Sequence, residues 1–311
     1  MFENKKYLKF LQKSISQNSD ILCVNILEKD DSSFQKSVRT MFLNTNYESV
    51  GFDFNIELKN FVFSHFNNIL ENKKGKYLAY SKTPNSKTIY CWVEPFYSEE
   101  NYSYMGQALK NAIKGVKTTL LRSTKFSGAH SFVPNFDENK NSFEQSKNLF
   151  YEEIKSPIRL LILGTAKGYI QLVRTAELLG WQTCLCDIKG NLVKKIKPLD
   201  EIILLNSIQN VTKVFNKNFD VAIIMENETN SNIYLEKLLE SSIPNIVVFN
   251  STKESEDIVE LFNFENNIII NNRVEFIKNT EYQTIDKLTF KVCKEVENKV
   301  NFRKEKKYEF V

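Results

Sequence analysis

The strongest chemical pattern in the sequence is a glycine turn of the kind that approaches phosphate groups. In the fingerprint G-x-G-x-x-G, the first glycine makes the tight turn, the second lets the backbone approach a pyrophosphate, and the third allows close packing of helix on strand. Gly164 stands at the first position, whereas Ala166 and Tyr169 stand at the second and third, and Gly168 is one place early. Asp187 follows at roughly the 20-residue spacing of the acid that binds a ribose hydroxyl. The pattern predicts a Rossmann-like strand, turn and helix and leaves nucleotide binding open.

Neighbouring groups could replace the contacts of the missing glycine. A phosphate at this turn would meet the amides after Gly164, the positive end of the following helix and the ammonium of Lys167. Thr165 and Lys189, beside the turn and beside Asp187, complete the candidate ligand-binding set. A lysine at an exposed turn can equally be solvated, so Lys167 has two interpretations.

A second polar group follows the apolar run VAII. Glu226, Asn227 and Glu228 stand just after this expected strand, and ligands of open α/β sheets bind at the carboxyl ends of strands. Glu226 and Asn227 are therefore candidate binding residues. General acid or base chemistry would need companion groups, so a polar loop is the favoured interpretation and no residue is assigned as catalytic.

The cysteines and histidines argue against a metal site or a disulfide framework. Five scattered cysteines, an odd number, favour reduced thiols in a cytosol. Cys184 and Cys186 alternate along one strand and could form a soft-metal or redox pair, but a core role is favoured because buried cysteine behaves as a small hydrophobe. Two histidines, His65 and His130, exclude a site of three imidazoles.

Composition places the chain among ordinary globular proteins. Its 311 residues are enough for two domains, and 42% hydrophobic residues supply the cores. The net charge of +4 comes from 42 basic and 38 acidic residues that are interspersed, which gives no support to nucleic-acid binding. No apolar stretch approaches the ~20 residues of a membrane-spanning helix. We therefore expect a cytoplasmic protein without membrane contact.

Apolar periodicity divides the chain into three parts. Residues 1–97 contain four expected strands, the last ending before Pro95, and an amphipathic helix over 57–70, which together predict a small α+β domain. Residues 98–156 are polar, with one helix candidate and one strand candidate, and are interpreted as a connecting segment. Residues 157–311 alternate strand and helix, which predicts a Rossmann-like, doubly wound parallel sheet and an α/β fold class.

Three segments of the first hundred residues are similar to sequence motifs that occur together in one protein family. EKDDSSFQKSVRTMFL is similar to a segment built on G-S-S-P-R and G-A-x-M, with Ser32, Ser33 and Met41 retained. SVGFDFNIE is similar to S-x-G-G-G-C-x-E, with Glu57 retained and Asn55 in place of the cysteine. YCWVEPF is similar to a V-E-P strand.

The second half continues the match. The run from RLLILG to DIKG is similar to L-I-F-G-A-G-H followed by a helix, L-L-G-W, a strand and D-x-R. IMENETN occupies the place of a T-H-D segment, and VFNSTK that of G-S-R-x-K, with Ser251 and Lys253 retained. Taken together, these segments resemble the XdhC/CoxI family of molybdenum-hydroxylase accessory factors over nearly the whole chain.

The resemblance implies an accessory role rather than an enzymatic one. Members of the family assist the insertion of sulfurated molybdenum cofactor into enzymes such as xanthine dehydrogenase. By this resemblance the ligand is molybdenum cofactor or a related nucleotide, the partner is a molybdenum hydroxylase or a sulfurtransferase, and the chain can pair as a homodimer. The resemblance adds Ser32, Ser33, Glu57 and Ser251 to the candidate cofactor-binding residues.

Two other functions stay open. An NAD(P)-binding oxidoreductase would need a catalytic acid and an intact phosphate turn, and the sequence argues against both. A divergent, non-catalytic member that acts through protein interaction is suggested by Ala166, Lys167 and Asn55, which replace the family's glycine, histidine and cysteine.

Overall fold

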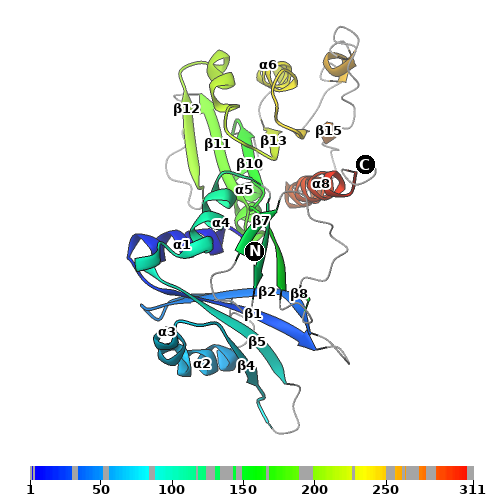
Figure 1. Cartoon of the computed structure of the whole chain (residues 1–311). Helices are drawn as coiled ribbons and strands as arrows, with labels where there is room; N and C mark the ends of the chain where they lie inside the picture. Colours follow the sequence, from blue (N-terminus) through cyan, green and yellow to red (C-terminus); the bar gives the residue numbers. More distant parts are fainter. Residues whose placement is uncertain are drawn as a thin grey trace. The chain divides into compact units, whose positions relative to one another are not determined.

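A computed structural model describes the chain over residues 2, 4–29, 34–51, 56–83, 88–116, 118–123, 130–133, 143–144, 149–165, 168–188, 199–225, 228–249, 256–260, 263, 273–277 and 285–306. The chain divides into two compact units, Met1–Ser156 and Pro157–Val311 (Figure 1). Each unit has its own sheets and its own buried apolar clusters. Among the described helices, none has both the length and the apolar character needed to cross a membrane.

The first unit is built on an antiparallel sheet of five strands in the order β3-β2-β1-β5-β4. The strands are β1 Ile21–Lys29, β2 Phe34–Asn44, β3 Ser49–Val50, β4 Lys76–Tyr80 and β5 Ile89–Phe96. Successive residues of a strand point to opposite faces. Leu22 and Val24 therefore belong to one buried cluster, and Ile21 and Cys23 belong to another.

Helices cover both faces of this sheet, as Figure 1 shows. They are α1 Lys5–Ser16, α2 Ile56–Ser64, α3 Phe66–Asn72 and α4 Ser103–Ile113. Leu58 and Val62 of α2 pack in the cluster of Leu22, together with Phe66 of α3. Leu8 of α1 and residues of α4 pack in the cluster of Ile21.

A smaller antiparallel sheet of four strands, in the order β7-β6-β9-β8, completes the first unit. Its strands are β6 Thr118–Ser123, β7 His130–Val133, β8 Phe143–Glu144 and β9 Leu149–Ile154, preceded by the short helix η1 Ser98–Glu100. Leu120 of β6 and Ile154 of β9 are fully buried in the cluster of Ile21. The segment interpreted from sequence as a connector, residues 98–156, thus contributes a helix and a sheet to the core of the first unit.

Two expected elements of this unit differ from the structure. The helix expected over 57–70 is interrupted at His65, whose amide donates to the Val62 carbonyl (3.1 Å) and whose ring Nδ1 lies 2.9 Å from the Phe61 carbonyl oxygen. The strand expected to end before Pro95 continues to Phe96. A proline is tolerated there because β4 pairs with β5 only as far as Val93, so no N–H is needed on that side.

The second unit is a parallel sheet of six strands in the order β12-β11-β10-β13-β14-β15. The strands are β10 Arg159–Leu163, β11 Gln182–Ile188, β12 Glu201–Leu205, β13 Val221–Ile224, β14 Ile246–Phe249 and β15 Val274–Ile277. The described helices are α5 Tyr169–Leu178, η3 Ile208–Val214, α6 Glu228–Leu239 and α8 Ile285–Lys306. The chain starts in the middle, runs out to β12 and then returns to β13, which makes the sheet doubly wound. The predicted α/β class and Rossmann-like domain are confirmed.

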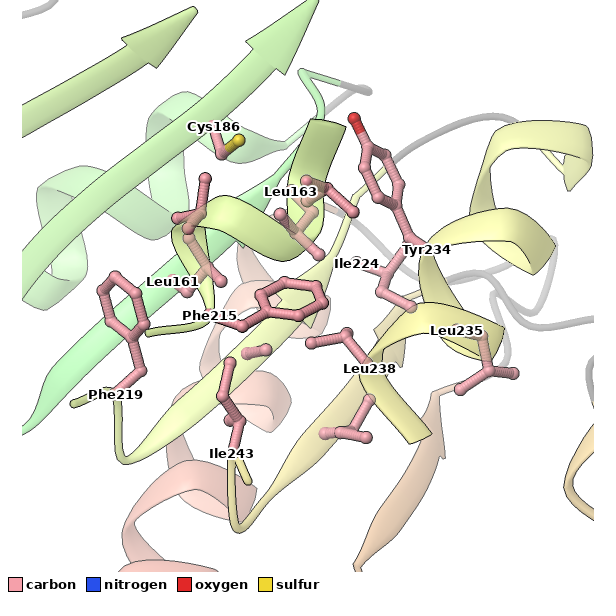
Figure 2. Close-up of a cluster of buried hydrophobic side chains, with 14 of the residues drawn as sticks. Leu161, Leu163, Cys186, Phe215, Phe219, Ile224, Tyr234, Leu235, Leu238 and Ile243 are labelled. Carbon is pink, nitrogen blue, oxygen red and sulfur yellow. The ribbon is translucent and has the colours of Figure 1, made fainter. Parts of the chain in front are cut away.

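Both faces of the parallel sheet are buried, which explains the continuous apolar runs of its strands. On one face, Leu161 and Leu163 pack with Phe215, which directly follows η3, and with Leu238 of α6 (Figure 2). On the other face, Leu160, Ile162 and Leu185 pack with α5 and α8.

Arg273 closes the carboxyl end of α6. Its guanidinium donates to the carbonyl oxygens of Leu238 (2.7 Å), Leu239 (2.9 Å), Ser241 (2.6 Å) and Ile243 (2.8 Å). Carbonyls at the end of a helix lack the amides of a following turn, so a side-chain donor stabilises them, and a cation there also complements the helix dipole. Arg273 therefore fixes α6 to the start of β15.

Candidate functional site

The glycine turn expected from sequence lies between β10 and α5. Gly164 follows β10 with φ of +86°, and its amide donates to the Cys186 carbonyl of β11 at 3.0 Å. Gly168 precedes α5 with φ of +105°, and its carbonyl accepts from the Leu172 amide at 3.0 Å. Both backbone conformations favour glycine, which has no Cβ to clash. The amino end of α5 is thereby placed at the carboxyl edge of the sheet, where anions bind in this class of fold.

Asp187 lies at the same edge, near the end of β11, and is completely buried. The Thr165 hydroxyl donates to its Oδ2 at 3.2 Å, and the Ile188 amide donates to its Oδ1 at 2.8 Å. Each carboxylate oxygen therefore accepts a hydrogen bond from the chain itself.

Tyr169 stands at the position of the third fingerprint glycine and is half-buried. The pKa of its hydroxyl is raised, first by burial and then by the negative charge of Asp187. The phenol and the carboxylate thus lie within electrostatic range of each other. The bulky residue at the third glycine position therefore interacts electrostatically with the acid that the fingerprint requires.

The structure brings four of the candidate residues together: Gly164, Thr165, Gly168 and Asp187. Another eight candidates lie outside the described residues: Ser32, Ser33, Ala166, Lys167, Lys189, Glu226, Asn227 and Ser251. The start of the loop after β13 is placed beside the glycine turn, because the Met225 amide donates to the Leu163 carbonyl at 2.7 Å.

Glu57 belongs to the first unit, in the first turn of α2. Its carboxylate pairs with the Lys82 ammonium at 2.8 Å and accepts from the Tyr80 hydroxyl at 3.3 Å. The hydrogen bond from Lys82 is the main cause that lowers the pKa of Glu57. The Glu57 side chain is exposed, and its assignment to a cofactor stays a prediction.

The cysteine pair of β11 belongs to the core, as the sequence favoured. Cys184 and Cys186 are buried among the apolar residues between the sheet and α6. Burial raises the pKa of each thiol to about 12, so both are neutral at physiological pH. Within the described part of the chain, no three His, Cys, Asp or Glu side chains form a group that could hold a metal ion.

Sequence reasoning missed a charged cluster inside the first unit. The Arg122 guanidinium of β6 pairs with Glu94 of β5 and with Glu152 of β9 (3.1 Å), and it donates to the Tyr104 hydroxyl at 3.0 Å. Side-chain exposure is 1% for Arg122, 7% for Glu94 and 3% for Glu152. The available signal was a single charged residue within each of the apolar strands LLRS and CWVEPF. Such a charge is almost always paired when it is buried.

Comparison with known proteins gives a structural match over nearly the whole chain. No family model matches the chain, and no curated protein matches it either. The crystal structure of a xanthine dehydrogenase from Bacillus halodurans superposes with a TM-score of 0.68, covering 99% of this chain and 97% of that one at 15% identity. The two chains share a fold. The structure of RSP, a Rex-family repressor, covers 47% of this chain and 62% of its own at 15% identity, with a TM-score of 0.28 that does not indicate a shared fold.

Proposed function

We propose that the second unit binds a phosphate-bearing cofactor at the carboxyl edge of its sheet, as part of an accessory protein of the XdhC/CoxI type. The observation that carries the proposal is the glycine turn. Gly164 and Gly168 hold the conformations that bring the amino end of α5 to this edge, although Ala166 and Tyr169 break the fingerprint. The fold that the chain shares with the Bacillus halodurans protein, over nearly the full length of both chains, also supports this proposal.

Molybdenum cofactor fits this site through its phosphate. The helix terminus and the turn amides suit a phosphate group, whereas the Thr165 hydroxyl already donates its proton to Asp187. The residues do not suit direct coordination of the metal, because the nearby thiols of Cys184 and Cys186 are buried and neutral. When bound, the cofactor would supply the molybdenum and its sulfur ligands itself, and the protein would bind the phosphate group of the cofactor.

The accessory role gives the protein two classes of partner. A molybdenum hydroxylase would receive the cofactor, and a sulfurtransferase would act on it beforehand. Pairing of two copies is a further part of the proposal. An NAD(P)-dependent oxidoreductase is a weaker alternative, because the acid expected to meet the ribose is fully buried.

Native mass spectrometry of the purified protein tests the proposal. We expect a bound pterin phosphate or nucleotide, and we expect Gly168→Ala to lose it, because an alanine at φ of +105° would displace the start of α5. Gly115→Ala is the matched control, since Gly115 also has a positive φ (+69°) but lies in the first unit. A ligand-free wild-type protein that also fails to bind inorganic pyrophosphate would overturn the proposal.

A further inference from the structure

The acid at the place of the ribose-binding residue is not presented to a ligand. In dinucleotide-binding folds the acid after the second strand accepts hydrogen bonds from the ribose hydroxyls, so at least one of its oxygens must face the ligand. Asp187 is 0% exposed, and its two oxygens accept from Thr165 and from the Ile188 amide.

Two side chains that interact with Asp187 come from the fingerprint itself. Thr165 directly follows the turn glycine Gly164, and its hydroxyl donates to Oδ2. Tyr169 opens α5 at the position where the fingerprint has its third glycine. Both side chains therefore project from the segment that would otherwise cradle a dinucleotide.

We propose that Thr165 and Tyr169 close the ribose subsite, so that this edge selects a phosphate-bearing ligand that is not held through a ribose. This inference rests on the proposed function and narrows its ligand class from nucleotides in general to phosphate esters such as a pterin phosphate. Because Asp187 is fully buried, a ribose 2′-hydroxyl could reach its carboxylate only if the Thr165 hydroxyl moved away, so that one hydrogen bond would replace another with little gain in affinity.

The inference predicts that the wild-type protein does not distinguish, by affinity, between two nucleotides that differ only in the ribose 2′-hydroxyl. Wild-type protein should bind ADP and 2′-deoxy-ADP with affinities within about twofold of each other. In the double variant Thr165→Ala/Tyr169→Ala, Asp187 becomes accessible, and ADP should bind about tenfold or more tightly than 2′-deoxy-ADP, the size of one hydrogen bond to a charged group. Adding Asp187→Asn should remove most of that preference.

Isothermal titration calorimetry with ADP, 2′-deoxy-ADP and inorganic pyrophosphate measures these affinities, with thermal unfolding as the check that each variant folds. Thr165→Val, which removes only the hydroxyl, should shift the preference in the same direction by a smaller factor. Thr175→Val, within α5, is the matched control and should leave all three affinities unchanged.

The outcomes separate the two proposals. A wild-type preference for ADP of tenfold or more would overturn the closed subsite and leave the proposed function standing. Wild-type protein that binds none of the three probes would overturn the proposed function, while the ADP preference of the double variant would still decide whether the subsite is closed. A folded double variant that does not distinguish ADP from 2′-deoxy-ADP would overturn the inference.

Discussion

The two units bury charge in different ways. In the first unit, Arg122 is surrounded by the side chains of Glu94, Glu152 and Tyr104, which come from two sheets and a helix. In the second unit, the buried carboxylate of Asp187 accepts hydrogen bonds from two neutral groups close to it in the fold, the Thr165 hydroxyl and the Ile188 amide. The partners of Arg122 come from separate packed elements, whereas the Thr165 contact with Asp187 comes from a single turn. We therefore expect the Arg122 cluster to be structural and the Thr165 contact with Asp187 to be the more easily changed of the two.

Replacing Arg122 should produce the largest effect. Arg122→Met leaves two carboxylates buried without their cation, and loss of one partner of a buried ion pair costs about 3 to 5 kcal/mol. Urea unfolding followed by circular dichroism measures the change. Arg174→Met, on an exposed position of α5, is the control and should change stability by less than about 0.5 kcal/mol. A loss below about 1 kcal/mol for Arg122→Met would contradict a structural role for the cluster.

Replacing Arg273 should produce a smaller effect in the second unit. Arg273→Met removes the hydrogen-bond donors to four carbonyl oxygens at the end of α6 and just after it. Water can replace part of these donors, because Arg273 is only half-buried. We expect a loss of about 2 to 3 kcal/mol, the upper range for hydrogen bonds to a charged group. Hydrogen exchange should locate the change at 235–243. Faster exchange confined to the first unit would be the contrary result.

Most of the fold could be predicted from the sequence, because the second unit repeats one pattern, a continuously apolar strand followed by a helix. Strands such as RLLIL and VAII are apolar throughout since both faces of a parallel sheet are covered. The first unit gave weaker signals. Its sheet of β6 to β9 lies in a polar stretch, where only LLRS suggested a strand, and long-range antiparallel pairing leaves little local pattern.

The candidate site could be predicted only in part. Glycine spacing located Gly164 and Asp187, because a positive φ and a strand end both have local sequence causes. The hydrogen bond from Thr165 to Asp187 depends on where the Thr165 side chain points, which spacing does not encode. Arg122 pairs with Glu94 and Glu152, which are about 30 residues away from it in the sequence, and no sequence motif predicts this pairing.

The smallest expected effect is the chemical labelling of the buried thiols in the native protein, because these thiols are neutral in both units. Burial raises the pKa of Cys91 in the first unit, and of Cys184 and Cys186 in the second, to about 12. The thiolate is the reactive form, so at pH 8 only on the order of one such thiol in 10⁴ is reactive, and the fraction rises as the pH rises. Iodoacetamide labelling followed by mass spectrometry should therefore be slow in the native protein and fast in urea. Rapid native labelling of Cys184 or Cys186 at pH 8 would point to a redox or metal role instead.

Hydrogen exchange with and without inorganic pyrophosphate tests most directly whether the ligand edge of the second unit, and not the charged cluster of the first, is the functional site. Saturating pyrophosphate should slow the exchange of amides in 164–172, at the glycine turn and the first turns of α5, and should leave β6 and β9 around Arg122 unchanged. Gly168→Ala should abolish this protection. Protection confined to β6 and β9, or none in a wild-type protein that binds pyrophosphate, would contradict the assignment of the site.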